Sequence, residues 1–219
     1  CIIIGDCKAK ILVPYGYQFF IALRLLNIKY VIIRKDVIPW PGVLPYPHFD
    51  YEFLINFFDF GQQYNFVRKV YNSTQYAIYE VNRPVGLIYI PHEVICINLK
   101  KEILFGEYRV PSIVKALSLI PANASYPAII DVSMCKSILR QIQRPSSNVE
   151  YEVTKYSPTL YSVKVLDAQK PFILVLSQNY DVNWKAFHDN SECKYHIKAN
   201  GYANAWIINK TKTCKITLY

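Results

Sequence analysis

The chain has 219 residues, of which 52% are hydrophobic and 19% charged, so it holds enough apolar surface for a packed core and is not a disordered chain. This length allows one large domain or two small ones, at about 100–200 residues per domain. The formal net charge is +9, but no run of Lys and Arg is longer than a pair. Nucleic-acid binding needs a clustered basic face, so no nucleic-acid partner is expected.

The first part of the chain is predicted to be mixed α/β. Apolar spacing indicates a helix at 18–26 with Asn27 as its C-terminal cap, followed by a buried strand at 29–33. Prolines between residues 39 and 47 predict an extended loop. The further expected elements are a helix at 51–60 with Phe53, Phe57 and Phe60 on one face, strands at 66–71, 75–81, 87–90, 94–97 and 128–132, and helices at 110–119 and 133–143.

The polar stretch 144–148 is the predicted domain boundary. After it, seven short apolar runs at near-regular spacing are typical of a β-sandwich. The predicted fold class is therefore α+β: a mixed α/β domain at 1–148, then an antiparallel, jelly-roll-like β-sandwich at 149–219. Its strands are expected at 149–156, 160–165, 172–177, 185–188, 194–198, 205–208 and 214–219.

Six cysteines stand far apart in the sequence, which fits three disulfides in an oxidising compartment. The segmentation suggests the pairs Cys1–Cys7, Cys96–Cys135 and Cys193–Cys214; the alternative is buried thiols. Because no pair has Cys-x-x-Cys spacing, no metal site is expected.

Three sequons, at Asn72, Asn123 and Asn209, strengthen an extracellular interpretation. No apolar stretch reaches the roughly 18–20 residues that span a bilayer, and no signal peptide opens the chain. The exporting segment is therefore expected to lie outside this sequence.

Catalytic signatures are weak. His188 and His196 flank Cys193 and are interpreted as exposed strand residues rather than metal ligands. A nucleophile elbow, a dinucleotide-binding loop and a P-loop are all missing from the sequence, so no catalytic residue and no cofactor are assigned. Carboxylate pairs such as Asp50 and Glu52 have the chemistry for acid–base work, but spacing does not place them in one pocket.

Three aromatic residues of the C-terminal part are candidates for carbohydrate binding: Tyr180, Trp184 and Trp206. Each lies near Asn or Asp, and their rings have faces that can stack on sugar rings. The alternative is core packing between two sheets, which aromatic residues commonly provide.

The same segments carry a resemblance. Pro171–Ser177 followed by Tyr180–Ala186 resembles the "strand–Ser–x–x–Tyr–x–x–x–Trp–Lys–Ala" signature of the C-terminal extracytoplasmic domain of YfhO-type polytopic membrane proteins and related GT-C glycosyltransferases. Leu25–Ile32 is similar to their helix-to-strand unit, and Tyr76–Pro84 to their "x–Tyr–Glu–Asn" strand. The three blocks follow the family's order.

This resemblance implies a soluble outer domain of a membrane glycosyltransferase-like protein, tethered by segments outside this chain. The catalytic carboxylate of GT-C enzymes lies in an early outer loop, so no catalytic role is carried over. The expected partner is a glycan or polymer acceptor. The cysteines and sequons depart from the family pattern and suggest an archaeal surface protein. The alternatives are a structural filament or S-layer subunit, a free carbohydrate-binding module and a secreted hydrolase.

Overall fold

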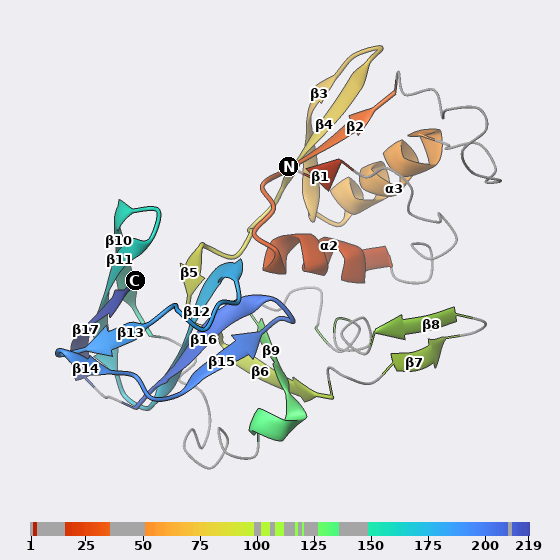
Figure 1. Cartoon of the computed structure of the whole chain (residues 1–219). Coiled ribbons are helices and arrows are strands. Elements are labelled where there is room, and N and C mark those ends of the chain that lie inside the picture. The colour runs from red at the N-terminus through yellow and green to blue at the C-terminus, as the bar shows by residue number, and fades with distance from the viewer. Residues whose placement is uncertain are drawn as a thin grey trace. The chain divides into compact units, whose positions relative to one another are not determined.

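The computed structural model describes residues 2–3, 16–35, 51–98, 102–105, 108–111, 117, 120, 127–135, 149–209 and 212–219. They belong to two compact units, residues 1–84 and 85–219 (Figure 1). No helix in these ranges is long and apolar enough to cross a membrane. The fold class is α+β, as predicted: the described residues form two helices of ten or more residues and many antiparallel strands.

The N-terminal unit is a four-stranded sheet with helices packed on one face (Figure 1). Its strand order is β1-β2-β4-β3, where β1 (Ile2–Ile3) runs parallel to β2 (Tyr30–Arg34) and the other neighbours are antiparallel. The strands predicted at 66–71 and 75–81 are present as β3 (Val67–Asn72) and β4 (Tyr76–Val81), which pair antiparallel.

The first helix, α2 (Gly16–Leu25), ends as predicted. Asn27 has a φ of 54°, and the Ile28 amide donates to the Leu23 carbonyl at 3.0 Å. Asn tolerates this left-handed conformation better than most residues, and the bond satisfies a carbonyl that the helix end leaves open. This turn directs the chain into β2.

Phenylalanines fill the layer between the helices and the sheet. Phe20 of α2 stacks on Phe57 of α3 (Tyr51–Gln63) and on Phe66, with ring centroids 5.0 and 5.3 Å apart. Burying one such side chain contributes about 1.5–3 kcal/mol. The predicted apolar face of α3 is corrected: Phe60 is 43% exposed, and Leu54, Phe57 and Phe58 are buried. The side chain of Phe53 lies outside the described residues.

The C-terminal unit contains two packed sheets, which makes it β-sandwich-like. The five-stranded sheet has the order β10-β11-β17-β13-β14, and the six-stranded sheet the order β5-β12-β16-β15-β9-β6. Their strands are β5 (Ile88–Tyr89), β6 (Glu93–Ile97), β9 (Pro127–Asp131), β10 (Tyr151–Ser157), β11 (Leu160–Ala168), β12 (Phe172–Asn179), β13 (Ala186–His188), β14 (Ser191–Glu192), β15 (His196–Ala199), β16 (Ala203–Ile208) and β17 (Lys212–Leu218). A separate hairpin joins β7 (Glu102–Phe105) to β8 (Tyr108–Pro111).

The sandwich core combines alternate residues of both sheets. Val163 and Val165 of β11 and Ile216 of β17 face Leu174 of β12 and Trp206 of β16, and all five are almost fully buried. Strand alternation explains this set, because successive side chains point to opposite faces of a sheet.

The structure places the boundary between the units after Pro84 rather than near residue 148. The reason is pairing across long sequence distances: β5 pairs with β12, and β9 pairs with β15. The sandwich is also not wholly antiparallel, because β6 and β9 run parallel. Most of the helix expected at 110–119, the end of that expected at 133–143 and the predicted boundary 144–148 lie outside the described residues.

Candidate functional site

A column of stacked side chains lies in the C-terminal unit. The Trp206 indole and the His196 imidazole are stacked, with centroids 4.7 Å apart and planes at 8°. Tyr180 follows at 4.9 Å from His196, and the Lys198 ammonium is 5.1 Å from the Tyr180 ring. The column thus runs from a fully buried indole through a half-buried imidazole and phenol to an exposed cation. A cation beside an aromatic ring is attracted by its π electrons.

Strand pairing builds the column. On β15 and β16, His196 lies opposite Trp206, and Lys198 lies opposite Asn204. Residues two apart on a strand share a face, so these four side chains are on the same side of the sheet. Tyr180 lies in the loop after β12. Its backbone amide donates a hydrogen bond to the Tyr202 carbonyl, which holds this loop in place.

Asn204 organises the polar side of the column. Its side chain is fully buried, and its Nδ2 donates to the carbonyls of Gln178 (3.0 Å) and Asn179 (3.1 Å). Its Oδ1 accepts from the Asp181 amide at 3.1 Å and lies 3.0 Å from His196 Nε2. Since Oδ1 is an acceptor, Nε2 of His196 must carry the proton, and Nδ1 is then an acceptor in the neutral ring.

Burial lowers the pKa of His196 below its usual value, and the Asn204 hydrogen bond and the Asp181 charge oppose this shift. Desolvation disfavours the charged form of an imidazole. At neutral pH His196 is therefore an uncharged, hydrogen-bonded ring held between two other rings.

The loop beside the column presents polar groups. The Asp181 carboxylate accepts from the amide and the side chain of Asn183, both at 2.9 Å. The Trp184 amide donates to the Asp181 carbonyl at 3.1 Å, which closes the turn. Asp181, Val182 and Asn183 are exposed. The turn directly after Tyr180 thus exposes an acid and an amide to solvent.

The three sequence-predicted aromatic residues have different environments. Trp206 is 1% exposed and belongs to the core, so the interpretation as core packing holds for it. Trp184 is half-buried and packs against that core, with its ring 6.1 Å from that of Tyr161. Tyr180 lies in the column. The sequence interpretation missed Lys198 and Asn204, which spacing alone does not connect to Tyr180.

The two histidines also differ from the expectation of exposed strand residues. His188 is 7% exposed, and its Nε2 lies 3.1 Å from the Asp189 carboxylate. His196 is half-buried in the column. Both rings are covered because they face the interior side of their strands.

One predicted disulfide is confirmed. Cys96 of β6 is bonded to Cys135, with Cα atoms 6.0 Å apart. Cys1 and Cys7 lie outside the described residues.

The predicted Cys193–Cys214 disulfide is wrong for this structure, where both residues are thiols. The Cys193 amide donates to the Ala186 carbonyl, and Cys214 lies on β17. The two thiols are within electrostatic range, because the Cys214 charge adds to the raised pKa of Cys193, but no bond joins their sulfur atoms. Burial raises the pKa of the Cys193 thiol to about 11.

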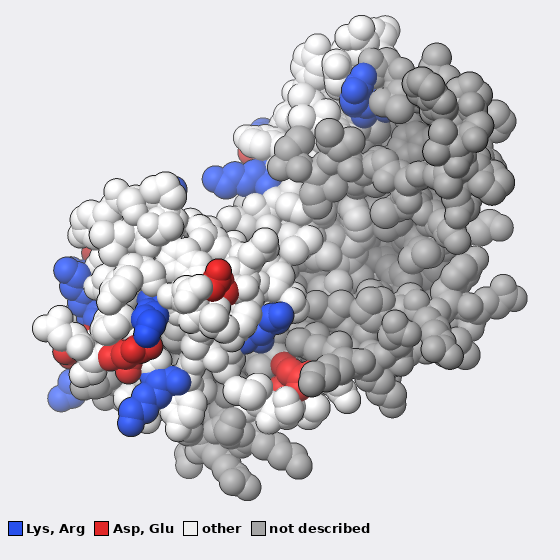
Figure 2. Space-filling model, in the orientation of Figure 1, with Lys and Arg blue, Asp and Glu red and all other residues white. Residues whose placement is uncertain are grey.

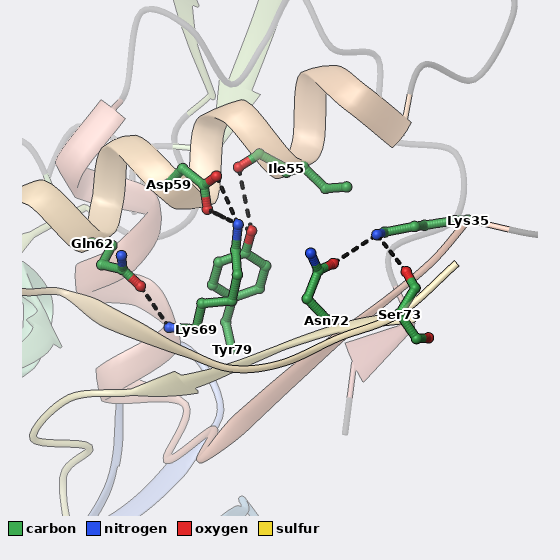
Figure 3. Close-up of polar contacts among 8 residues, drawn as sticks. All are labelled: Lys35, Ile55, Asp59, Gln62, Lys69, Asn72, Ser73 and Tyr79. Carbon is green, nitrogen blue, oxygen red and sulfur yellow. Dashed lines mark hydrogen bonds and ion pairs between the residues drawn. The ribbon is translucent and has the colours of Figure 1, made fainter. Parts of the chain in front are cut away.

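Two of the three sequon asparagines are described, and both are exposed: Asn72 and Asn209. Asn72 ends β3, where its Oδ1 accepts from Lys35 Nζ at 2.7 Å (Figure 3). A glycan attached to Nδ2 leaves that oxygen available. Asn123 lies outside the described residues.

The N-terminal unit has a polar cluster between α3 and its sheet (Figure 3). The Tyr79 hydroxyl donates to Asp59 Oδ1 at 2.7 Å, and Lys69 Nζ donates to Asp59 Oδ2 at 2.8 Å. Burial and the Asp59 carboxylate raise the pKa of Tyr79 above its usual value. The cluster fastens the helix to the sheet, since the buried phenol keeps a hydrogen-bond partner.

Basic and acidic side chains are interspersed over the part of the C-terminal unit visible in Figure 2. On that face they do not gather into one basic patch.

Comparisons with protein-family models, curated proteins and solved structures found no match. The sandwich and the column therefore define the class only as an α+β protein with a β-sandwich-like unit.

Proposed function

We propose that the chain is an extracytoplasmic recognition module of a membrane-bound, glycosyltransferase-like protein, and that it binds a glycan or polymer acceptor through Tyr180 and its neighbours. The observation that carries the proposal is the column of Trp206, His196, Tyr180 and Lys198. It holds one aromatic ring rigidly beside groups that bond sugar hydroxyls.

The polar groups suit this ligand. Asp181 supplies acceptors, Lys198 supplies donors and Asn183 supplies both, all from exposed positions. Binding sites combine an apolar surface with a few placed polar groups. Rigid placement of Tyr180 reduces the entropy that binding loses.

The compartment is supported by the Cys96–Cys135 disulfide and the exposed sequon asparagines. The membrane link rests on the resemblance described above. Sequencing the full reading frame tests it: several hydrophobic spans are expected beside this region, and a reading frame without any would refute the membrane assignment.

A glycan array followed by calorimetry tests the binding. Tyr180→Ala is expected to weaken the best ligand about tenfold, which corresponds to ~1.4 kcal/mol. The matched control is Tyr156→Ala, because Tyr156 is 63% exposed on β10. Binding that is absent, or equally weakened by both variants, would refute recognition through Tyr180. The Trp184→Ala variant shows whether the neighbouring indole contributes.

A further inference from the structure

The N-terminal unit has a polar pocket that is separate from the column. Its volume is about 390 Å³, and it is lined by Gln62, Asn65, Val67, Arg68, Asn82 and Arg83. These residues come from the end of α3, from the start of β3 and from the turn after β4. Small-ligand sites begin at about 300 Å³, so the pocket admits a group the size of one sugar unit.

The two turns that form the pocket are joined by hydrogen bonds. Asn82 Nδ2 donates to Asn65 Oδ1 at 2.8 Å and to the Asn65 carbonyl at 3.1 Å. The Asn82 amide donates to the Phe66 carbonyl at 2.8 Å. Arg24 Nε donates to the Asn82 carbonyl at 2.8 Å, and its guanidinium lies 4.9 Å from the Phe66 ring centroid. The pocket walls are thus fixed before any ligand binds.

Positive charge dominates this region. Arg68 Nη2 is 2.6 Å from Glu80 Oε2, so the charges of these two side chains neutralise each other. Arg83 is exposed and has no ion pair or hydrogen bond to any part of the chain that the structure describes. Arg24 adds a third guanidinium behind the turns. Among the described residues that line the pocket there are two arginines and no Asp or Glu.

The remaining polar groups are complementary. Gln62 Oε1 accepts from the Lys69 amide at 2.7 Å, which leaves the Gln62 amino group as a donor. A guanidinium presents two parallel N–H groups that match a carboxylate or phosphate. The side-chain oxygen of Asn82 is an acceptor for a hydroxyl group of the ligand.

We infer that this pocket binds an oxyanion carried by a small hydroxylated group, with Arg83 as the main contact. The shared chemistry is a carboxylate or phosphate on a sugar-sized unit. This site goes beyond the proposed function and does not depend on the aromatic column, so either site can fail alone.

The test is a nuclear magnetic resonance titration of the full 219-residue chain with inorganic phosphate, glucuronate and, as the neutral arm, glucose. Saturable shifts are expected at Asn65, Asn82 and Arg83 with an anion and not with glucose. Saturation by phosphate alone identifies a phosphate-bearing ligand, and saturation by glucuronate alone identifies a carboxylated sugar. Absence of saturable shifts, or equal response to glucose, overturns the inference.

Arg83→Gln is expected to raise the dissociation constant at least tenfold, because it removes a charge-assisted hydrogen bond. Arg83→Lys keeps the charge without the fork, so an intermediate loss is expected. The control is Arg34→Gln, an exposed arginine of the same sheet beside Tyr76. It removes the same formal charge, and less than a twofold change is expected. Equal losses in the Arg83→Gln and Arg34→Gln variants overturn the inference, because they indicate attraction to overall charge.

Discussion

Replacement of Asn204 by Ala removes the centre of the hydrogen-bond network beside the column. Asn204 is fully buried and makes four hydrogen bonds, two as donor to the Gln178 and Asn179 carbonyls and two as acceptor. Each contributes about 0.5–1.5 kcal/mol net. The acceptor side faces the half-buried His196 and the exposed Asp181, whose polar groups can bond water instead. The expected loss is therefore about 2–4 kcal/mol.

Urea unfolding measures this loss through the two tryptophans of the C-terminal unit, in a Trp40→Phe background. The midpoint should fall without a change of slope. The control is Asn183→Ala, an exposed amide whose side chain bonds only Asp181 among the described residues, with an expected loss below about 0.5 kcal/mol. A loss below about 1 kcal/mol in Asn204→Ala would refute the view that this network holds the loop.

Three further predictions concern pH, the disulfide and the helix layer. Because folding lowers the pKa of His196, the unfolded chain binds more protons below about pH 6.5; the stability that His196 contributes is therefore full above that pH and falls as the pH decreases towards the folded-state pKa. His196→Gln should flatten the dependence of the urea midpoint on pH over that range. An unchanged pH dependence would contradict this cause. Cys135→Ser removes a disulfide between residues 39 apart in the sequence and should lower the free energy of unfolding by about 4 kcal/mol. The urea midpoint should fall, and reducing agent should no longer shift it. A variant as stable as wild type would contradict this prediction. Gly61→Ala places a methyl group against the Phe20 ring and should cost about 1–3 kcal/mol in thermal unfolding, whereas an unchanged melting temperature would show that the ring moves freely.

The sequence was sufficient for most local structure. Apolar runs and periodicity located α2, α3 and seven of the strands described in residues 149–219, and missed the short exposed strand β14. Asn27 was recognisable as a cap because Asn adopts a positive φ at low cost.

What the sequence could not show was long-range pairing. The boundary prediction failed because β5 and β9 join a sheet formed mainly by strands about 70–90 residues later, and nothing local records such partners. Cys193 and Cys214 were predicted as a pair from their order in the sequence, but both are thiols in the structure. Tyr180 was identified as a candidate, but Lys198 and Asn204 joined it only through the β15–β16 pairing.

Glycan recognition at the column is tested most directly by titrating the intact chain with a glycan while the ring resonances of Tyr180 and His196 are recorded. With the best ligand of the array, both rings should shift together and saturate at one dissociation constant, because they are stacked 4.9 Å apart. The Tyr156 ring, on β10, should not move. Saturable binding that shifts Tyr156 or other residues while Tyr180 and His196 stay unchanged would contradict recognition at the column.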